Sequence, residues 1–283
     1  MPKKHQTSYL FLYSTYISKL RICFVIIFFS YIWLLFDSAH MFRHKDKSRT
    51  LQQNLRIASL LAFVAGIVNV VGFLSVQTLT TNVTGHFTFM VDEALRINLR
   101  QALFYFLYIF SFLFGSFFSN FVIEITNKIS NKYVFVIPVL TEACILFSLG
   151  LLKYSLILAH PNAIACVLLF VMGLQNSLVT TISNAVVRTT HLTGLFTDLG
   201  IEISQLFFFR SETSHQKLMG SIKLRLTIIS TFFLGGIFAG LLFSYIQMYT
   251  LLFASLALLF ALVSDYLSTM LRFKKLKALR YSK

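Results

Sequence analysis

Six apolar runs, each long enough to cross a lipid bilayer, set what this chain can fold into. An α-helix rises ~1.5 Å per residue, so about 20 residues cover the hydrocarbon core of a bilayer. Only 12% of the residues are charged, whereas a soluble domain carries about 25%. The runs are residues 57–76, 102–125, 133–152, 163–186, 224–246 and 249–267. The sequence therefore predicts an all-α polytopic membrane protein with a six-helix core.

The lysine and arginine residues between these runs predict the orientation of the core, because cytoplasmic loops carry an excess of both. If Arg56 is cytoplasmic, only Arg96, Arg100 and Lys153 face outward. The basic residues that then face the cytoplasm are Arg43, Lys45, Lys47, Arg49, Arg56, Lys128, Lys132, Arg188, Arg210, Lys217, Lys223, Arg225, Arg272, Lys274, Lys275, Lys277, Arg280 and Lys283. We therefore expect a protein of the cell membrane with its C-terminus in the cytoplasm. Its basic tail then faces anionic lipids.

A seventh apolar run, residues 22–36, is shorter than the length that a membrane-spanning helix needs. If it spanned the membrane, it would place Lys3, Lys4, Lys19 and Arg21 outside, and it ends without a small-residue cleavage motif. Two interpretations stay open: an extra helix or interfacial anchor, or an upstream translation artefact with the start at Met41. We treat residues 1–42 as an N-terminal extension and leave them out of the functional argument.

A nine-residue motif occurs twice, as TTNVTGHFT (80–88) and TTHLTGLFT (189–197), with six identical letters. Each copy follows a run with Gly-x-x-Asn and precedes a run with two small residues four positions apart. The matching residues are Gly66 and Asn69, Gly173 and Asn176, Gly115 and Ser119, and Gly236 and Gly240. We interpret the small pairs as helix-packing faces. The fixed order indicates an internal repeat, with three runs in residues 43–154 and three in 155–283.

Three runs per repeat is an odd number, so the second copy must enter the bilayer upside down. The basic residues agree, because they place the first Thr-Gly turn at the outer end of its run and the second at the inner end. Inverted repeats of this kind recur in transporters, which bind solutes near the midplane between the halves. The sequence thus predicts two inverted three-helix repeats.

The Thr-Gly turns themselves are candidate parts of a solute or ion pathway. Gly85 and Gly194 can adopt positive φ and break a helix, and the neighbouring threonines, including Thr84 and Thr193, can bind the freed backbone groups. We therefore predict two broken or re-entrant elements. The alternative is a pair of ordinary interfacial caps, in which threonine begins one helix and glycine ends another.

Polar residues within or beside the runs complete the candidate pathway. Glu142 lies near the middle of the third run, where a carboxyl group costs ~2.5–3.5 kcal/mol and often carries protons. Asn69 and Asn176 occupy matched repeat positions, which favours a shared polar site. His86 and Asp198 lie in or just after the turns. Each also has a simpler interpretation: hydrogen bonds between helices for Glu142 and the amides, a hydrated interfacial ring for His86, and a first-turn helix residue for Asp198.

The chain resembles the YoaK-type family, six-helix bacterial membrane proteins of unknown function. The resemblance covers roughly residues 52–271 and is carried by three segments, LLAFVAGIVNVVGF (60–73), NVTGHF (82–87) and VMGLQNS with VVRTTHLTGLFTDL (171–199). The family's first turn typically reads Met-Thr-Gly-Asn, and this chain departs from it at Val83 and His86. The second turn fits the family pattern at Arg188, Thr190, Thr193 and Gly194. The resemblance implies a six-helix architecture and supplies no activity.

The sequence contains no metal-ligand spacing, nucleophile elbow, Walker loop or dinucleotide fingerprint. We therefore expect no enzyme activity, metal site or cofactor, and no nucleic-acid partner. The leading hypothesis is a transporter of an unidentified small solute or ion, with Glu142 as a proton coupler. The alternatives are a membrane scaffold or partner subunit, and an intramembrane enzyme that would require Glu142, His86 and Asp198 to cluster. The small-residue faces also allow a homo-oligomer.

Overall fold

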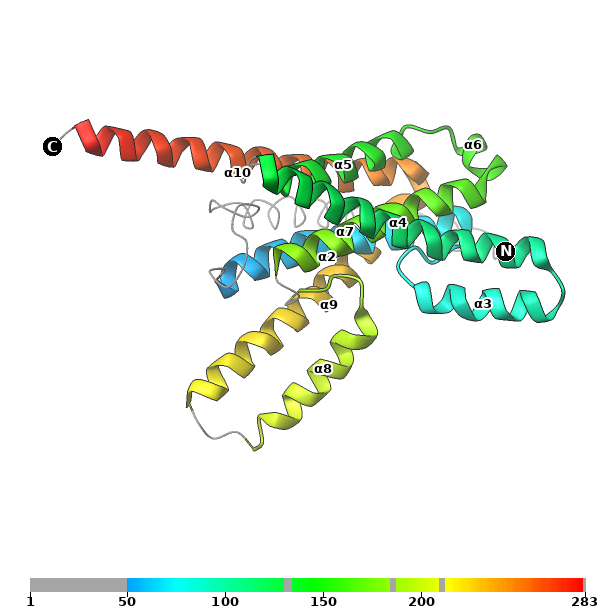
Figure 1. The fold of residues 1–283 in the computed structure, drawn as a ribbon, viewed down its shortest axis with the longest axis horizontal. Coiled ribbons are helices and arrows are strands. Elements are labelled where there is room, and N and C mark those ends of the chain that lie inside the picture. Colours follow the sequence, from blue (N-terminus) through cyan, green and yellow to red (C-terminus); the bar gives the residue numbers. More distant parts are fainter. Residues whose placement is uncertain (1–49, 130–133, 184–186, 209–211, 282–283) are drawn as a thin grey trace, which may run out of the picture. The chain divides into compact units, whose positions relative to one another are not determined.

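The computed structural model describes residues 50–129, 134–183, 187–208 and 212–281, which form helices and no strand (Figure 1). The prediction of an all-helical chain is therefore confirmed for these residues. They belong to one unit, Ala39–Lys283. The apolar run at residues 22–36 lies outside the described residues, as do the side chains of the basic tail.

Several helical stretches are long and apolar enough to cross a membrane, by length and composition. They are α2 (Leu51–Val76), α4 (Leu99–Ile129), α7 (Pro161–Ile182) and the stretch His215–Ser268. That last stretch covers most of α9 (Glu212–Ile246) and α10 (Thr250–Tyr281), which are joined by a 3-10 turn at Gln247–Tyr249. A fifth apolar helix, α5 (Val136–Gly150), is shorter. Each of the six apolar runs in the sequence overlaps one of these helices.

Local signals fix both ends of α2. Thr50 and Gln53 form a reciprocal capping box, in which the Gln53 N–H donates to Thr50 Oγ1 at 3.3 Å and the Thr50 N–H donates to Gln53 Oε1 at 3.0 Å. The helix ends at Gln77, which has φ 53° and donates its N–H to Phe73 O. The helix therefore starts before the apolar run, because the capping residues and not hydropathy decide where it begins.

Two helices that the apolar runs did not predict begin within the two Thr-Gly motifs. α3 (Val83–Leu95) folds back along α4, and α8 (Leu192–Gln205) folds back along α9 (Figure 1). A third short helix, α6 (Tyr154–Ala159), leads into α7. Such short helices are marginal alone and depend on packing against a neighbour. Hydropathy runs therefore could not reveal them.

The glycines of the two turns do not break a helix, and that prediction is wrong. No described glycine has a positive φ. Gly85 lies in the first turn of α3 and donates its N–H to the side chain of Asn82, the N-cap residue, at 2.9 Å. A Cβ at Gly85 or Gly194 would collide with the side chain of the residue that caps its helix, Asn82 or His191. The missing side chain makes room for the cap.

Helices α2 and α9 cross in close backbone contact. The carbonyl oxygen of Phe232 lies against Gly66, and the carbonyl oxygen of Phe63 lies against Gly235. A Cβ at either glycine would overlap that oxygen. On each helix, phenylalanine precedes glycine by three positions.

Helices α4 and α7 cross in the same manner. Here the carbonyl oxygen of Phe170 lies against Gly115, and that of Phe112 lies against Gly173. The spacing of phenylalanine and glycine is again three. Ser116 adds a hydrogen bond from its Oγ to Gly173 O at 2.9 Å. Two reciprocal glycine contacts therefore hold each crossing.

The two small-residue pairs that the sequence analysis assigned to helix packing supply only some of the glycines in these crossings. Gly115 is one of them, and Ser119 next to it is fully buried. In the second half the contact residue is Gly235, whereas Gly236 and Gly240 face the Val70 side chain. A Cβ at Gly240 would lie 3.9 Å from Val70, which is an ordinary contact. The expectation that Gly240 permits a close backbone approach is therefore wrong.

The remaining helices extend the bundle around these crossings. α5 and α10 pack together, with Ser255 Oγ donating to Ala143 O at 2.8 Å. Followed by colour in Figure 1, α2 and α7 run in opposite directions, as do α5 and α10. The two Thr-Gly turns, which follow α2 and α7, therefore leave the bundle at opposite ends.

Candidate functional site

A cavity of about 370 Å³ that is lined by polar residues, here called the amide cavity, lies along α4 and α7 next to the second Thr-Gly turn. Its lining consists of amide, hydroxyl and basic side chains, namely Ser116, Asn120, Asn176, Ser177, Thr180, Thr181, Arg188 and His191. Residues three and four apart share one face of a helix. The polar residues on each helix are four apart, so each helix turns one polar face to the cavity.

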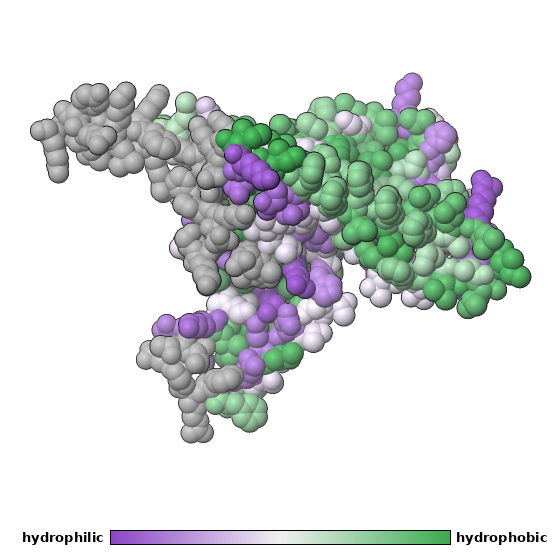
Figure 2. Space-filling model, in the orientation of Figure 1, coloured by the Kyte–Doolittle hydropathy of each residue, from purple (hydrophilic) through white to green (hydrophobic). Residues whose placement is uncertain are grey.

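A second cavity of about 440 Å³, here called the ion-pair cavity, shares Arg188 and His191 with the first. Its other lining residues come from α8 and α9: Gly194, Leu195, Asp198, Ser221 and Arg225. Figure 2 shows hydrophilic residues gathered over α8 and the start of α9, whereas hydrophobic residues cover the side that carries α3 and α4. The two cavities thus form one polar region in a chain of apolar helices.

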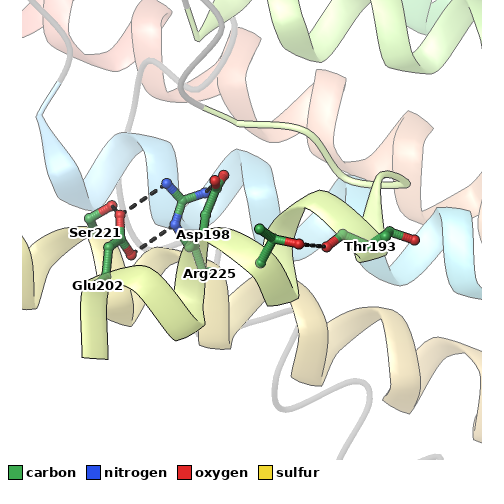
Figure 3. A network of polar contacts seen from close by, with 6 residues as sticks. Thr193, Asp198, Glu202, Ser221 and Arg225 are labelled. Atoms are coloured by element: carbon green, nitrogen blue, oxygen red, sulfur yellow. Dashed lines mark hydrogen bonds and ion pairs between the residues drawn. The ribbon is translucent and has the colours of Figure 1, made fainter. Parts of the chain in front are cut away.

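An ion-pair network joins α8 to α9 in this region (Figure 3). Arg225 on α9 binds Glu202 with two hydrogen bonds, Nε to Oε2 at 2.8 Å and Nη2 to Oε1 at 3.0 Å. Its Nη1 lies 2.9 Å from Asp198 Oδ2. Ser221 Oγ also donates to Glu202 Oε1, at 2.5 Å. Such bidentate pairs hold both partners in a defined geometry, so this network fixes α8 on α9.

The second Thr-Gly turn is tied to the bundle by a buried glutamine. Gln175 Nε2 donates to Leu61 O on α2 at 2.8 Å and to Thr189 Oγ1 at 3.3 Å. Gln175 and Thr189 are both fully buried. One side chain on α7 therefore positions the start of the turn that carries Arg188 and His191.

The first Thr-Gly turn is held in a similar way. Thr81 Oγ1 donates to Asn69 Oδ1 at 2.9 Å, and the buried Thr80 Oγ1 donates to Val68 O at 3.4 Å. Asn69 therefore binds within its own turn, whereas Asn176 lines the amide cavity. The sequence prediction of one shared amide site is not supported by these contacts.

His86 is buried, contrary to the expectation of a hydrated interfacial ring. It is 3% exposed, and its Nε2 lies 2.8 Å from Leu79 O. The ring packs against Tyr105 and Tyr108, at centroid distances of 6.0 and 5.3 Å. Tyr108 in turn donates its hydroxyl to Asn162 Oδ1 at 2.6 Å. A carbonyl oxygen can only accept, so the ring nitrogen at Leu79 carries the proton.

We expect acid to destabilise the protein through His86. Its Nδ1 has no hydrogen-bond partner among the described residues. Burial lowers the pKa of His86 and outweighs the bond to Leu79, which raises it. An unfolded histidine takes up a proton near pH ~6.5. Unfolding then binds a proton, so stability is full above that pH and falls as the pH drops toward the lower folded pKa.

Thermal unfolding of the purified protein between pH 7.5 and pH 5 measures this dependence. The His86→Gln variant can keep a donor for Leu79 O without titrating, so its unfolding midpoint should fall less across the same range. An equal fall in both proteins would show that other groups cause the acid sensitivity.

The two folded-back helices are fastened by different chemistry. Phe89 and Asp198 occupy matching positions, because each directly follows its copy of the nine-residue motif. Tyr105 and Arg225 also match, because each lies the same number of residues before the contact glycine of its helix, Gly115 or Gly235. Phe89 and Tyr105 make a ring contact at 5.4 Å, where the second half has the ion pair. Matched positions thus give an apolar contact on α3 and a charged one on α8.

Glu142 lies apart from both cavities. It is on α5 and fully buried, and neither carboxyl oxygen has a hydrogen-bond partner among the described residues. Burying an unpaired polar group is costly, so such a group usually has a functional reason. The interpretation of Glu142 as a hydrogen bond between helices is not supported by these contacts.

The residues predicted for one site therefore fall into three places. Asn176, Gly194 and Asp198 line the two cavities, and Thr193 lies in the first turn of α8, where its carbonyl accepts from Thr197. The residues of the first turn form a separate group: Asn69, Thr84, Gly85 and His86. The third place is Glu142. The cluster that an intramembrane enzyme would need is not formed.

Several residues in or beside the cavities were not predicted as site residues from the sequence. Arg225 and Glu202 meet only because α8 folds back on α9. The stripe on α7 could have been found, because Asn176, Ser177, Thr180 and Thr181 repeat at a spacing of four in an apolar run.

Comparisons with known proteins agree with the resemblance seen in the sequence. Residues 57–264 match a family described as "Protein of unknown function (DUF1275)". Neither a curated protein nor a solved structure matches the chain. The matched range runs from within α2 to within α10 and includes both Thr-Gly turns. The chain belongs to this family of unknown function.

Proposed function

We propose that this protein is an integral membrane transporter and that its solute passes through the amide cavity and the ion-pair cavity. The observation that carries the proposal is the amide cavity itself. It places several amide and hydroxyl groups on two predominantly apolar helices of membrane length. Polar groups in a bilayer are costly unless they pair or line a water-filled space.

The size and lining of the cavities support a small solute. Ligand sites commonly measure ~300–1,000 Å³ and present a few polar groups that fix the ligand. The amide cavity, at about 370 Å³, is in this range. The ion-pair cavity continues from it through Arg188 and His191. A solute passing between the cavities would therefore meet mostly charged groups in the ion-pair cavity and mostly neutral ones in the amide cavity.

The internal repeat supports a transport mechanism. The contact at Gly66 and Gly235 and the contact at Gly115 and Gly173 are built alike from matching helices of the two halves. Both turns are followed by a helix that folds back. We infer two inverted three-helix repeats, in which the halves move against each other to expose the cavity to either face.

Glu142 is the group we assign to energy coupling. A buried carboxyl without a partner responds strongly to gain or loss of a proton, because an unpaired charge there is costly. We infer that it carries a proton while the solute crosses. In Glu142→Gln this exchange is impossible, so downhill solute movement should persist and its stimulation by a pH gradient should vanish.

The pathway can be tested by blocking it with a single cysteine. Ser177→Cys, made in a protein lacking Cys23, Cys144 and Cys166, places a thiol in the amide cavity. Proteoliposome swelling with glycerol, glycine, acetate and phosphate gives the flux. Reaction with a membrane-impermeant thiol reagent on the cytoplasmic side should reduce the flux by roughly tenfold, because the added group fills much of the cavity.

The matched control is Gly200→Cys on α8. A Cβ there would have no atom within 4 Å, and the residue is exposed, so labelling it should leave the flux unchanged. Flux that survives complete labelling of Ser177→Cys would remove the cavity from the pathway. No flux of any solute in either protein would instead favour a scaffold or partner subunit.

A further inference from the structure

We propose that the amide cavity selects a small oxyanion, such as a carboxylate or phosphate group, with Arg188 as its anchoring residue. This inference rests on the proposed function, because it names the substrate class of the same cavity.

Among the residues that the structure describes, no acidic one lines the amide cavity. Its charged or titratable lining residues are Arg188 and His191, and its other lining side chains are amides and hydroxyls. These neutral groups can all donate hydrogen bonds. A cavity with this lining offers a positive charge and several donors, which suits an anion and disfavours a cation.

The acidic residues on α8, Asp198 in the ion-pair cavity and Glu202 outside its lining, are already bound by a cation. Asp198 and Glu202 are both bound by Arg225, at 2.9 and 2.8 Å. Arg225 is thereby occupied as a structural cation, and its side chain is only 20% exposed. No carboxylate among the described residues pairs with Arg188. Arg188 is therefore the guanidinium that remains available to a ligand.

The position of Arg188 makes it suitable for this role. It lines both cavities and directly precedes Thr189, the first residue of the second Thr-Gly motif. Val187 before it is fully buried, and its N–H donates to Ser183 Oγ at 2.9 Å, which fixes the backbone there. The planar guanidinium can bind two oxygens of one carboxylate or phosphate, which a lysine cannot reproduce.

Two sources of the same chemistry have to be separated, a free solute and the phosphate of a lipid headgroup. The purified protein in detergent micelles is titrated with sodium acetate or sodium phosphate, with sodium chloride holding the ionic strength constant. Parallel samples receive glycerol, or phosphatidylglycerol added to the micelles. The thermal unfolding midpoint reports binding, because a ligand that binds only the folded state raises it.

We expect acetate or phosphate to raise the midpoint in a saturable way. Arg188→Gln should weaken the apparent affinity about tenfold or more, since a charge-assisted hydrogen bond is lost. Arg188→Lys should restore part of it. The matched control is Arg96→Gln, because Arg96 is exposed, lies at the end of α3 and lines neither cavity. It should bind acetate and phosphate as the wild type does.

The contrary outcomes are distinct from one another. An Arg188-dependent shift with phosphatidylglycerol, and none with acetate or phosphate, would keep the oxyanion site and reject the free solute. A shift with glycerol that Arg188→Gln does not change would overturn the anion inference, while labelled Ser177→Cys could still block flux and sustain the pathway. Anion binding without any block of flux would overturn the pathway and keep the site.

Discussion

Gly115→Ala is expected to lower the free energy of unfolding by about 3 kcal/mol, or to prevent folding, although it adds only one methyl group. The new Cβ would overlap the carbonyl oxygen of Phe170 on α7. That oxygen belongs to a helix backbone and cannot rotate away, so the two helices would have to separate. Overpacking commonly costs ~1–3 kcal/mol, and separation also loosens the reciprocal contact at Gly173.

Two glycines of the same chain serve as controls for the added methyl group. Gly200→Ala on α8 adds a Cβ with no atom within 4 Å, and Gly240→Ala adds one in ordinary contact with Val70. Alanine is a better helix former than glycine by ~0.5–1 kcal/mol, so both variants should unfold at an equal or higher temperature. Thermal unfolding in detergent measures all three. A Gly115→Ala protein as stable as Gly200→Ala would contradict the close crossing of α4 and α7.

Arg225→Met is expected to cost about 2 kcal/mol of unfolding free energy and to release α8 from α9. It removes the only basic group among the described residues that is paired with Glu202, whose side chain is 12% exposed. Breaking a fully buried pair costs ~3–5 kcal/mol, and partial exposure reduces that figure. Methionine keeps the length and much of the apolar stem, so the loss reports the charge.

The exposed pair of Arg96 and Asp92 on α3 gives the matched comparison. Their side chains are 70% and 52% exposed, and surface pairs contribute ~0–1 kcal/mol. Arg96→Met should therefore change the unfolding free energy by less than about 1 kcal/mol. The double variant Arg225→Met/Glu202→Gln should recover part of the loss, because the less exposed carboxylate is then neutral, while the Asp198 side chain, which also loses Arg225, is 50% exposed. Equal costs for Arg225→Met and Arg96→Met would show that burial adds nothing to the pair.

The candidate site could be predicted only in part from the sequence, because some of its residues are far apart along the chain and meet only in the folded protein. Asn176 and Asp198 could be singled out because a polar residue in or beside an apolar run is conspicuous. Glu202 and Arg225 are 23 positions apart, with a turn between them, and no local pattern pairs them. His86 looked like an interfacial residue, yet α3 folds back and buries it against Tyr105 and Tyr108.

The sequence by itself determined the helical class, the membrane-length apolar helices and the order of matching elements in the two halves. These follow from composition and from residue spacing along the chain, since hydropathy and the helix period are local properties of the sequence. Only the tertiary structure decided which glycines meet a facing backbone: Gly235 does and Gly240 does not, although both lie in one helix. It also decided that α8 returns along α9, which brings Arg225 to Asp198 and leaves Arg188 facing the cavities. Such contacts depend on how each helix is rotated about its axis and on where two helices cross. A shift of one residue along either helix would turn a different face to its neighbour.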